Sequence, residues 1–334
     1  MSKIRYCNGC GVRLQDENML NIGFTTNLKN DLCMRCFRLK NYGEYESVAS
    51  SLIDVEKILK SINKTNSLVL YAVDLLNLPK NIKDIKKIIH NDCILVLNKR
   101  DLLPLSVKDE KIIDYIKKQD LGFNDIVITS SEKNYGMDLL HSKIKKYQNG
   151  VNVYVVGYTN AGKSSLISRF IKDYGNGNVS LSTSPLPSTT LDKIIIPINK
   201  ELTLIDTPGI IDNNNIINFV DKKLYKKLNT KREIKPKTYQ LNGKESLLVD
   251  ELLRINYLDN TKNSFTFYIP NDIKIQKAGM DNMSLKELDF RTFLVNDNED
   301  LVISGLGFVK IVSKCRIEIH INKDIEVFTR KSMI

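Results

Sequence analysis

The chain has 334 residues, a formal net charge of +11 and 42% hydrophobic residues. That length exceeds one ordinary domain and fits two or three, with enough apolar side chains for real cores. A membrane-spanning helix needs roughly 20 apolar residues, and the longest apolar stretch, around residues 67–73, is far shorter. The positive charge indicates a polyanionic partner, and nucleic acid fits better than a membrane because no amphipathic anchor is evident.

Two Cys-x-x-Cys pairs stand near the amino end, Cys7 with Cys10 and Cys33 with Cys36. Each pair puts two thiolates on one tight turn, and two such turns complete the tetrahedral ligand set of structural zinc. A redox dithiol or a disulfide is the alternative, and it fits less well because no thioredoxin-like strand and helix accompany the pairs. We therefore expect residues 1–45 to form a zinc module of treble-clef or knuckle type, which would hardly fold without the metal.

A pattern of helices and strands follows, with a helix over residues 50–62, a strand over 67–74, a helix over 82–89 and a strand over 93–97. Directly after this last strand comes the tetrapeptide Asn98-Lys99-Arg100-Asp101, which has the NKxD pattern of a guanine-reading motif. The Asp101 carboxylate can accept from the ring N–H and the exocyclic amine of guanine, which adenine does not offer there. Such a site rejects the wrong base by roughly 10⁴-fold.

Other side chains are expected to complete the base site. Asn98 lies at the same rim of the sheet as Asp101, and Lys99 would pack its stem along the base. Ser130 and Ser131, in a Thr-Ser-Ser sequence, would bring backbone N–H groups to the guanine O6.

A phosphate-binding loop of the form GxxxxGK[ST] spans Gly157–Ser164, between an apolar strand at 151–156 and a helix-like run at 165–171. In such a loop the backbone N–H groups and the helix N-terminus cradle the phosphates. Lys163 would reach the outer phosphates, and the Ser164 hydroxyl would bind magnesium. The residues expected to contact the nucleotide here are Gly157, Asn160, Ala161, Gly162, Lys163, Ser164 and Ser165.

A second apolar strand, over residues 202–205, ends at Asp206 in the sequence Asp-Thr-Pro-Gly. The Asp206 carboxylate would hold the magnesium shell, and the Gly209 N–H would meet the γ-phosphate. Thr190, with Thr189 as the alternative, would add a hydroxyl to the metal. We expect Lys163, Thr190 and Gly209 to serve hydrolysis, which should be slow because the residue after Gly209 is an isoleucine where water-orienting enzymes have glutamine.

The order of these motifs is unusual. The guanine-reading motif precedes the phosphate-binding loop, so the usual cycle of five motifs is cut between its third and fourth members. Each short motif alone is weak evidence, but five in cyclic order, each at the end of a strand, predict a nucleotide crevice at the carboxyl ends of an α/β sheet. The predicted fold is therefore a circularly permuted P-loop GTPase domain of the α/β class.

The region after the GTPase motifs is basic and then rich in strands. Residues 222–237 contain eight basic side chains and one acidic side chain, Glu233. The basic side chains either contact RNA phosphates or form a solvent-exposed face of the protein. Strands are predicted over 264–269, 273–277, 301–312 and 316–321, with Gly305 and Gly307 forming a bend or bulge inside a strand. We expect three domains: the zinc module at 1–45, the GTPase at 46–221, and a basic linker with a β-rich (α+β) RNA-binding domain at 222–334.

On these motifs the sequence resembles the YqeH-type circularly permuted GTPases of bacteria. The matching segments span nearly the whole chain: CNGCG, CMRCFRLKNYGEY, VDLLN, VLNKRDLLP, VVGYTNAGKSSLI, SPLPSTTLD, IDTPGII and ISGLGFVKI. The resemblance implies bound GTP or GDP, magnesium and zinc, and a role in small-ribosomal-subunit assembly with ribosomal RNA or a subunit precursor as partner. Asn160 matches the position at which potassium-stimulated relatives hold the cation, the alternative being a loop-stabilising asparagine.

Three functions fit these motifs. The first is a GTP-dependent switch that binds ribosomal RNA or precursor subunits, and the second is an RNA-binding scaffold that holds GTP structurally. The third, a metabolic P-loop kinase, fits poorly because a kinase needs no NKxD motif. We expect a cytoplasmic protein, since Cys7 leaves no room for a signal or transit peptide ahead of it, and we expect a monomer without a membrane partner.

Overall fold

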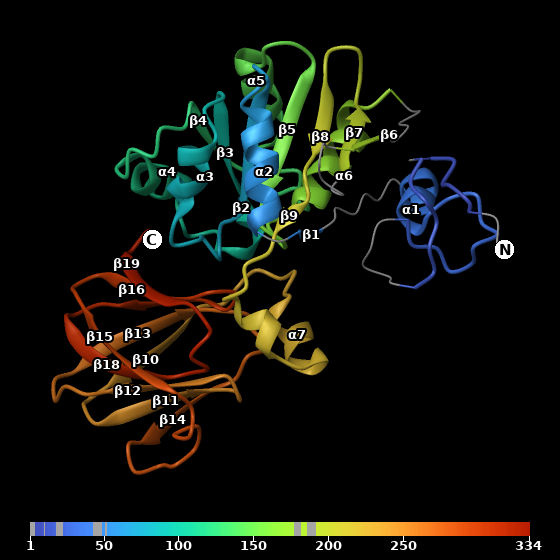
Figure 1. The fold of residues 1–334 in the computed structure, drawn as a ribbon. Helices are drawn as coiled ribbons and strands as arrows, with labels where there is room; N and C mark the ends of the chain where they lie inside the picture. Colours follow the sequence, from blue (N-terminus) through green and yellow to red (C-terminus); the bar gives the residue numbers. More distant parts are fainter. Residues whose placement is uncertain are drawn as a thin grey trace. The chain divides into compact units, whose positions relative to one another are not determined.

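The computed structural model describes residues 4–9, 11–17, 23–42, 49–50, 52–176, 182–185 and 192–334. The chain divides into two compact units (Figure 1). The first consists of Met1–Leu75, Asn81–Arg100 and Asp120–Asp212, and the second of Leu76–Lys80, Asp101–Gln119 and Asn213–Ile334. The second unit thus includes two short stretches that the sequence analysis placed in the GTPase domain, while the predicted limits at residues 45 and 221 stay a prediction.

The described residues of the first unit contain a seven-stranded sheet in the order β4-β3-β2-β5-β8-β7-β6. Its strands are β2 (Leu68–Asp74), β3 (Cys93–Asn98), β4 (Asp125–Ile128), β5 (Asn152–Gly157), β6 (Ser182–Pro185), β7 (Asp192–Pro197) and β8 (Thr203–Asp206). Five of these strands pair in parallel, and β6 and β7 extend the edge in antiparallel fashion. Strands β2 and β3 are buried along almost their whole length, which explains their continuous apolar sequences. The α/β fold predicted from the sequence is confirmed.

Four helices accompany the strands of this sheet. Helix α2 (Leu52–Ile62) precedes β2, α3 (Ile82–Ile88) connects β2 with β3, α5 (Met137–Tyr147) connects β4 with β5, and α6 (Lys163–Tyr174) follows β5. Apolar side chains of α5 and α6, among them Leu140 and Phe170, share one buried cluster with Leu70, Ile94 and Val155 of the sheet. The sequence pattern predicted helices at 50–62 and 82–89 and a helix-like run at 165–171, whereas α5 was not predicted.

The permuted chain brings the nucleotide motifs to one edge. The parallel strands β3, β5 and β8 end at Asn98, Gly157 and Asp206. Strand β2 lies between β3 and β5, with Asp74 opposite Asn98 and Ala72 opposite Gly157. Since parallel strands place their carboxyl ends on the same side, the three motifs meet there whatever their order in the chain.

All residues of the second unit are described, and they form two antiparallel five-stranded sheets. One has the order β10-β13-β17-β16-β19, with bounds Lys237–Leu241, Asn263–Tyr268, Gly307–Ile311, Glu299–Ile303 and Val327–Lys331. The other has the order β14-β11-β12-β18-β15, with bounds Ile275–Gly279, Glu245–Val249, Leu253–Tyr257, Cys315–His320 and Phe290–Val295. Phe265 and Phe267 of the first sheet and Ile255 and Ile317 of the second belong to one buried cluster, so the sheets share a core.

The second unit also contains the α-helices α4 (Asp109–Lys117) and α7 (Lys222–Leu228) and the 3₁₀ helix η2 (Ile216–Phe219). The 3₁₀ helix η1 (Arg100–Leu102) belongs to it from Asp101 onward. Asp221 caps α7, because its side chain accepts a hydrogen bond from the Leu224 N–H at 2.8 Å.

One predicted strand is wrong. Residues 301–312 are not a single strand with a bend but two strands, β16 and β17, which pair with each other in a hairpin. Gly305 lies in the connection and Gly307 is the first residue of β17, with φ of +83° and +124°, a region that favours glycine. A Cβ at Gly307 would also overlap the backbone oxygen of Tyr268. The two glycines therefore belong to a turn that the alternating apolar pattern alone did not distinguish from a bulge.

Candidate nucleotide and zinc sites

The side chain of Asn98 joins three loops at the edge of the sheet. It is 2% exposed, and its Oδ1 accepts hydrogen bonds from the Ser131 N–H at 3.2 Å, the Ser131 hydroxyl at 3.1 Å and the Thr129 hydroxyl at 3.2 Å. Its Nδ2 donates to the backbone oxygens of Ala161 at 3.2 Å and Gly162 at 3.4 Å. One amide thus connects the guanine-reading motif to the Thr-Ser-Ser loop and to the phosphate-binding loop.

The backbone of the phosphate-binding loop explains its glycine and asparagine. Gly162 has a φ of +86°, and a Cβ there would overlap the Nδ2 of Asn98. Only glycine fits this position, directly before α6. Asn160 is exposed and has a φ of +63°, a conformation that asparagine adopts more readily than most residues.

Lys163 is held inside the loop. Its side chain is buried, and its Nζ donates to the backbone oxygen of Gly157 at 3.3 Å. Burial lowers the pKa of the Lys163 ammonium, and the charge of Asp206 acts in the opposite direction. A buried ammonium of this kind is stabilised by added negative charge, which the phosphates of a nucleotide supply. Ser164 follows it in the first turn of α6.

The Asp-Thr-Pro-Gly motif lies against the same loop. Asp206 is 1% exposed at the end of β8, and a Cβ at Gly209 would lie 3.0 Å from the Lys163 Nζ. The Thr159 N–H donates to the Ile210 oxygen at 2.8 Å, and the Ile210 side chain is fully buried. A buried carboxylate beside the loop, with the Ser164 hydroxyl, suits magnesium, which prefers oxygen ligands. Thr189 and Thr190 lie outside the described residues.

Strand β9 (Gly209–Ile210) also pairs in parallel with β1 (Ala49–Ser50), a segment from the start of the chain. The motif that carries Gly209 is therefore bonded on one side to the phosphate-binding loop and on the other to β1. This pairing was not foreseen from the sequence, since a two-residue strand carries no periodicity.

The guanine-reading loop contains a charge pair that sequence reasoning missed. The Lys99 Nζ lies 3.0 Å from the Asp74 Oδ2, and the two side chains are 27% and 11% exposed. Lys99 has a φ of +66°, and Asp74, the last residue of β2, stands opposite Asn98. The signal that could have revealed Asp74 is its place at the carboxyl end of a buried strand, the same position that identified the other motifs.

Two backbone groups expected to reach the guanine O6 have partners within the protein. The Ser130 N–H donates to the Tyr135 oxygen at 2.9 Å, and the Ser131 N–H donates to Asn98 as described above. Asp101 follows in η1 and is partly exposed. The loop is thus fixed by the hydrogen bonds that the nucleotide was expected to use.

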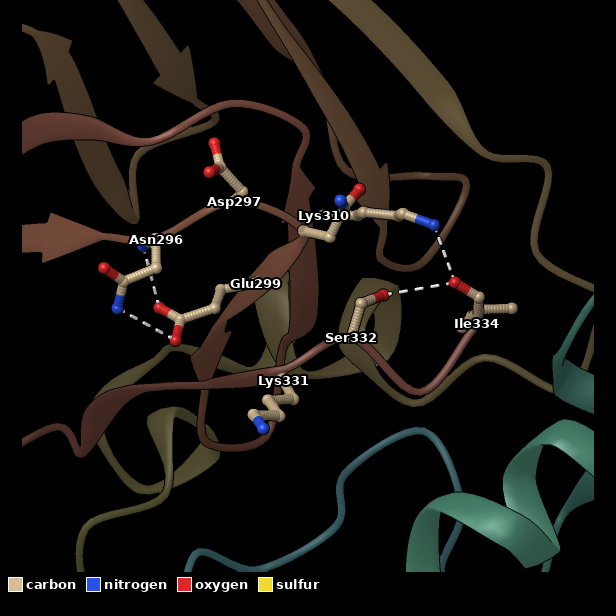
Figure 2. A pocket seen from close by; sticks show the side chains of 8 residues that line it. Asn296, Asp297, Glu299, Lys310, Lys331, Ser332 and Ile334 are labelled. Carbon is tan, nitrogen blue, oxygen red and sulfur yellow. Dashed lines mark hydrogen bonds between the residues drawn. The ribbon is translucent and has the colours of Figure 1, made fainter.

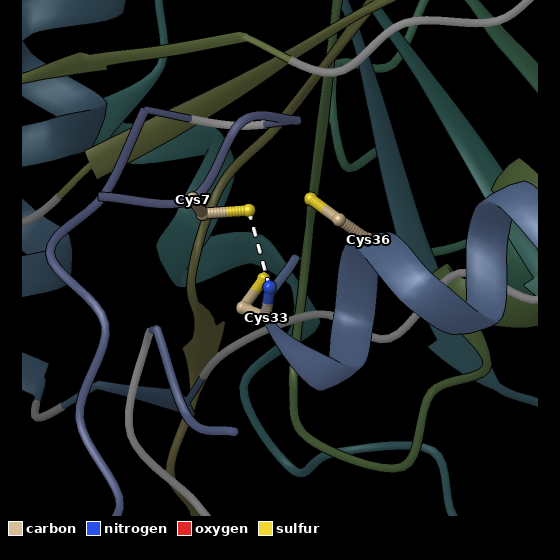
Figure 3. A group of neighbouring side chains, drawn as sticks. All are labelled: Cys7, Cys33 and Cys36. Carbon is tan, nitrogen blue, oxygen red and sulfur yellow. Dashed lines mark hydrogen bonds between the residues drawn. The ribbon is translucent and has the colours of Figure 1, made fainter. Parts of the chain in front are cut away.

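The cysteine cluster is assembled by a short hairpin and a helix (Figure 3). The sulfurs of Cys7, Cys33 and Cys36 lie within 4.8 Å of one another, and all three side chains are buried. The Cys7 Sγ accepts from the Cys33 N–H at 3.2 Å and the Gly9 N–H at 3.4 Å. Helix α1 (Met34–Tyr42) begins directly after Cys33, and Cys36 lies in its first turn. Cys10 lies outside the described residues.

The chemistry of this cluster fits zinc. The two N–H donors stabilise the Cys7 thiolate, and three converging thiolates are ligands that Zn²⁺ binds in structural sites. The remaining described cysteines differ, because Cys93 and Cys315 are buried in strands and burial raises the pKa of each thiol to about 12. They are neutral core residues.

Comparison with known proteins decides the family. A family model described as 50S ribosome-binding GTPase matches residues 152–253, and one described as YqeH-like, C-terminal matches residues 280–333. The YqeH protein of Bacillus subtilis, itself described as uncharacterised, is 35% identical, and the alignment covers 98% of this chain and 99% of that one. The chain belongs to the YqeH family. The GTPase match begins at the phosphate-binding strand and leaves out the guanine-reading motif ahead of it, in line with the permuted order.

More distant relatives of this YqeH-family chain include the NO-associated protein 1 of Arabidopsis thaliana, 23% identical over 99% of this chain and 77% of its own length. GTPase Der of Mesoplasma florum is 30% identical over 58% of this chain and 45% of its own length. Together with the site, family membership supports a GTP-binding role. In the described part of the chain, no helix is both long and apolar enough to span a membrane.

The Lys99–Asp74 pair predicts a role for Asp74 in nucleotide binding by this YqeH-family GTPase. Asp74→Asn should weaken binding of both GTP and GDP roughly fivefold, which corresponds to about 1 kcal/mol for a partly buried ion pair. A titration with a fluorescent guanine nucleotide measures the change. The matched control is Asp84→Asn, which breaks the exposed pair of Asp84 with Lys87 on α3, 2.8 Å apart. Equal affinities for the Asp74 variant and the wild type would show that the pair does not support the base site.

The cysteine cluster predicts about one bound zinc per chain. Cys33→Ser should lose the metal and expose the first 45 residues to protease, because this segment has little core of its own. Guanine nucleotide binding should persist, since the nucleotide motifs lie at the ends of β3, β5 and β8 and contain none of the three cysteines. Elemental analysis and limited proteolysis measure both effects, with chelator-treated wild type as the comparison. An amino-terminal segment that stays protease-resistant without metal would contradict the zinc assignment.

Proposed function

We propose that this chain is a slowly hydrolysing GTP switch that acts in ribosome assembly by binding ribosomal RNA or a small-subunit precursor in the cytoplasm. The observation that carries the GTPase part is the buried Asn98 side chain, which connects the guanine-reading and phosphate-binding loops into one site. A metabolic kinase would have no use for this connection. The description of the matched family model names the 50S ribosome, which supports a ribosomal partner but not the choice of subunit.

The roles of individual residues follow from the site. Backbone N–H groups of Gly157–Ser164 and the Lys163 ammonium would hold the phosphates, and Asp206, Ser164 and Thr190 would bind magnesium, which neutralises charge on the outer phosphates. Gly209 would offer its N–H to the γ-phosphate. The fully buried Ile210 side chain has no polar group that could orient water, which supports a slow intrinsic rate.

The RNA part of the proposal depends on the basic segment at 222–237. Six of its cations are exposed: Lys222, Lys223, Lys226, Lys231, Arg232 and Lys235. Two others have partners within the protein. The Lys227 Nζ lies 2.6 Å from the Asp250 Oδ2, and the Lys237 Nζ donates to the backbone oxygens of Asn271 and Ile273. The exposed cations suit the counterion release that gives RNA affinity without sequence specificity.

The alternative function is an RNA-binding scaffold in which GTP is held but not cycled. It is favoured by the absence of a water-orienting side chain after Gly209. Single-turnover hydrolysis measured with and without small-subunit particles separates the two functions, since a switch should be stimulated by its particle and a scaffold should not.

Asn160 predicts an effect of monovalent cations on turnover. If this exposed side chain helps hold potassium beside the phosphates, GTP hydrolysis should be several-fold faster in potassium than in sodium, because the cation neutralises charge as it develops. Asn160→Ala should remove the difference while nucleotide affinity changes little. Rates are measured in matched chloride salts, and equal wild-type rates in both salts would leave Asn160 with a role in loop conformation only.

The exposed cations predict the partner. Replacing Lys226, Lys231 and Arg232 by alanine should weaken binding to small-subunit RNA and reduce the log–log salt slope by roughly one unit for each lost phosphate contact. GTP affinity should not change. The control variant replaces Lys111, Lys117 and Lys118 by alanine. These lysines are exposed on or beside α4, and their replacement removes the same amount of positive charge.

The same variants test the ribosomal role. Wild-type protein with a GTP analogue should capture 30S precursors from purified particles, and the triple variant should capture fewer. An unaltered salt slope, or equal reductions in the two triple variants, would exclude the segment 222–237 as the RNA contact. Capture of 50S particles alone would contradict the small-subunit assignment.

A further inference from the structure

The boundary between the two compact units falls inside the guanine-reading motif. Asn98, Lys99 and Arg100 belong to the first unit, whereas Asp101 begins the stretch Asp101–Gln119, which belongs to the unit with the two antiparallel sheets. This stretch lies in sequence between the two guanine-reading loops. The residue expected to read the base is therefore part of the β-rich unit.

Two hydrogen bonds attach this stretch to the basic segment. The Ile234 N–H donates to the Leu102 oxygen at 2.9 Å, and the Leu105 N–H donates to the Glu233 Oε1 at 3.1 Å. Leu102 and Ile234 are buried, at 4% and 1% exposed. Leu102 is the last residue of η1 and directly follows Asp101. Glu233, the single acid of the segment 222–237, thus holds the backbone at Leu105, and its neighbour Ile234 holds Leu102, the residue directly after Asp101.

The backbone on either side of Ile234 is also bonded to Asn271. The Asn271 Nδ2 donates to the backbone oxygen of Glu233 at 2.8 Å, and the Lys235 N–H donates to the Asn271 Oδ1 at 2.8 Å. Asn271 follows strand β13. The segment is therefore bonded both to η1 and to the residues after β13, and the exposed cations Lys231, Arg232 and Lys235 flank Glu233 and Ile234.

We propose that Glu233 is a positioning residue for Asp101, and that a polyanion bound to the cations flanking Glu233 changes guanine nucleotide affinity through this contact. The second half rests on the proposed RNA-binding function. Phosphates that bind Lys231 and Lys235 would shift the backbone between them. Because this backbone is hydrogen-bonded to η1, the shift would change the orientation of the Asp101 carboxylate. By linkage, the factor by which RNA changes nucleotide affinity equals the factor by which nucleotide changes RNA affinity.

The experiment compares three variants of the full chain without RNA. Glu233→Ala removes the acceptor for the Leu105 N–H, and Glu233→Gln keeps an acceptor oxygen without the charge. The control is Glu299→Ala, because the Glu299 Oε2 likewise accepts a backbone N–H, that of Asn296 at 2.9 Å, beside a pocket of the same unit (Figure 2). GDP and IDP dissociation constants are measured by displacement of a fluorescent nucleotide. IDP lacks the exocyclic amine that Asp101 is expected to accept from.

Glu233→Ala should weaken GDP binding by about three- to tenfold, the effect of losing one charge-assisted hydrogen bond, and IDP binding by less. The ratio of GDP to IDP affinity should therefore fall, which a general loss of stability would not produce. Glu233→Gln and Glu299→Ala should retain the wild-type ratio. An unchanged ratio in Glu233→Ala would overturn the positioning role.

The second arm adds small-subunit ribosomal RNA to the wild type and to Glu233→Ala. RNA should change the GDP dissociation constant of the wild type several-fold and leave that of the variant unaffected, with RNA binding by both verified in a filter-binding assay. RNA that binds the wild type without changing its GDP dissociation constant would overturn the coupling. No RNA binding at all would overturn the coupling together with the proposed function, while the result of the first arm stands.

Discussion

The nucleotide site depends on one buried amide. Asn98 accepts three hydrogen bonds from the Thr-Ser-Ser loop and donates to two carbonyls of the phosphate-binding loop. A buried polar group that loses its partner costs about 1–3 kcal/mol, so each of these loops is held in the conformation that satisfies the amide. Gly162 shows how close the fit is, because any side chain at that position would occupy the space of the Asn98 Nδ2. The site is thus preorganised by contacts between loops that are distant in sequence.

This arrangement also explains why a permuted order of motifs is compatible with the fold. What the chemistry needs is that β3, β5 and β8 end on one side of the sheet with β2 between β3 and β5, and the sheet order provides this. Cutting the cycle elsewhere changes which loops are continuous but not which strand ends are neighbours. In this chain the segment after β8 continues through β9, which pairs with β1 from the start of the chain.

Much of the fold and site could be predicted from the sequence, and the failures have physical causes. The buried parallel strands carried clear apolar runs, so Asn98, Gly157 and Asp206 were placed correctly at their ends. Asp74 was missed because a carboxylate at a strand end has no motif of its own until its partner Lys99 is known. The hairpin between β16 and β17 was missed because the turn between them is short. Two strands with the same alternation of apolar and polar residues then look like one longer strand.

The role of the charged residues in the basic segment was beyond sequence reasoning altogether. Lys227 and Lys226 are neighbours of the same type, yet one is paired with Asp250 and the other is exposed. Similarly, the division of the chain between Arg100 and Asp101 arises from contacts of Leu102 and Leu105 with residues more than a hundred positions away. Such pairings depend on long-range packing, which local composition does not encode.

The separation between Asn98 and its carbonyl partners, 63 and 64 residues further along the chain, has a consequence for biosynthesis. During translation the guanine-reading strand leaves the ribosome well before the phosphate-binding loop does. Until that loop emerges, the Asn98 amide has no carbonyl of Ala161 or Gly162 to donate to, and the edge of the nascent sheet stays incomplete. A nascent chain of this protein therefore cannot acquire guanine nucleotide in stages: the base-binding half waits for the phosphate-binding half, and the site closes in a single late step.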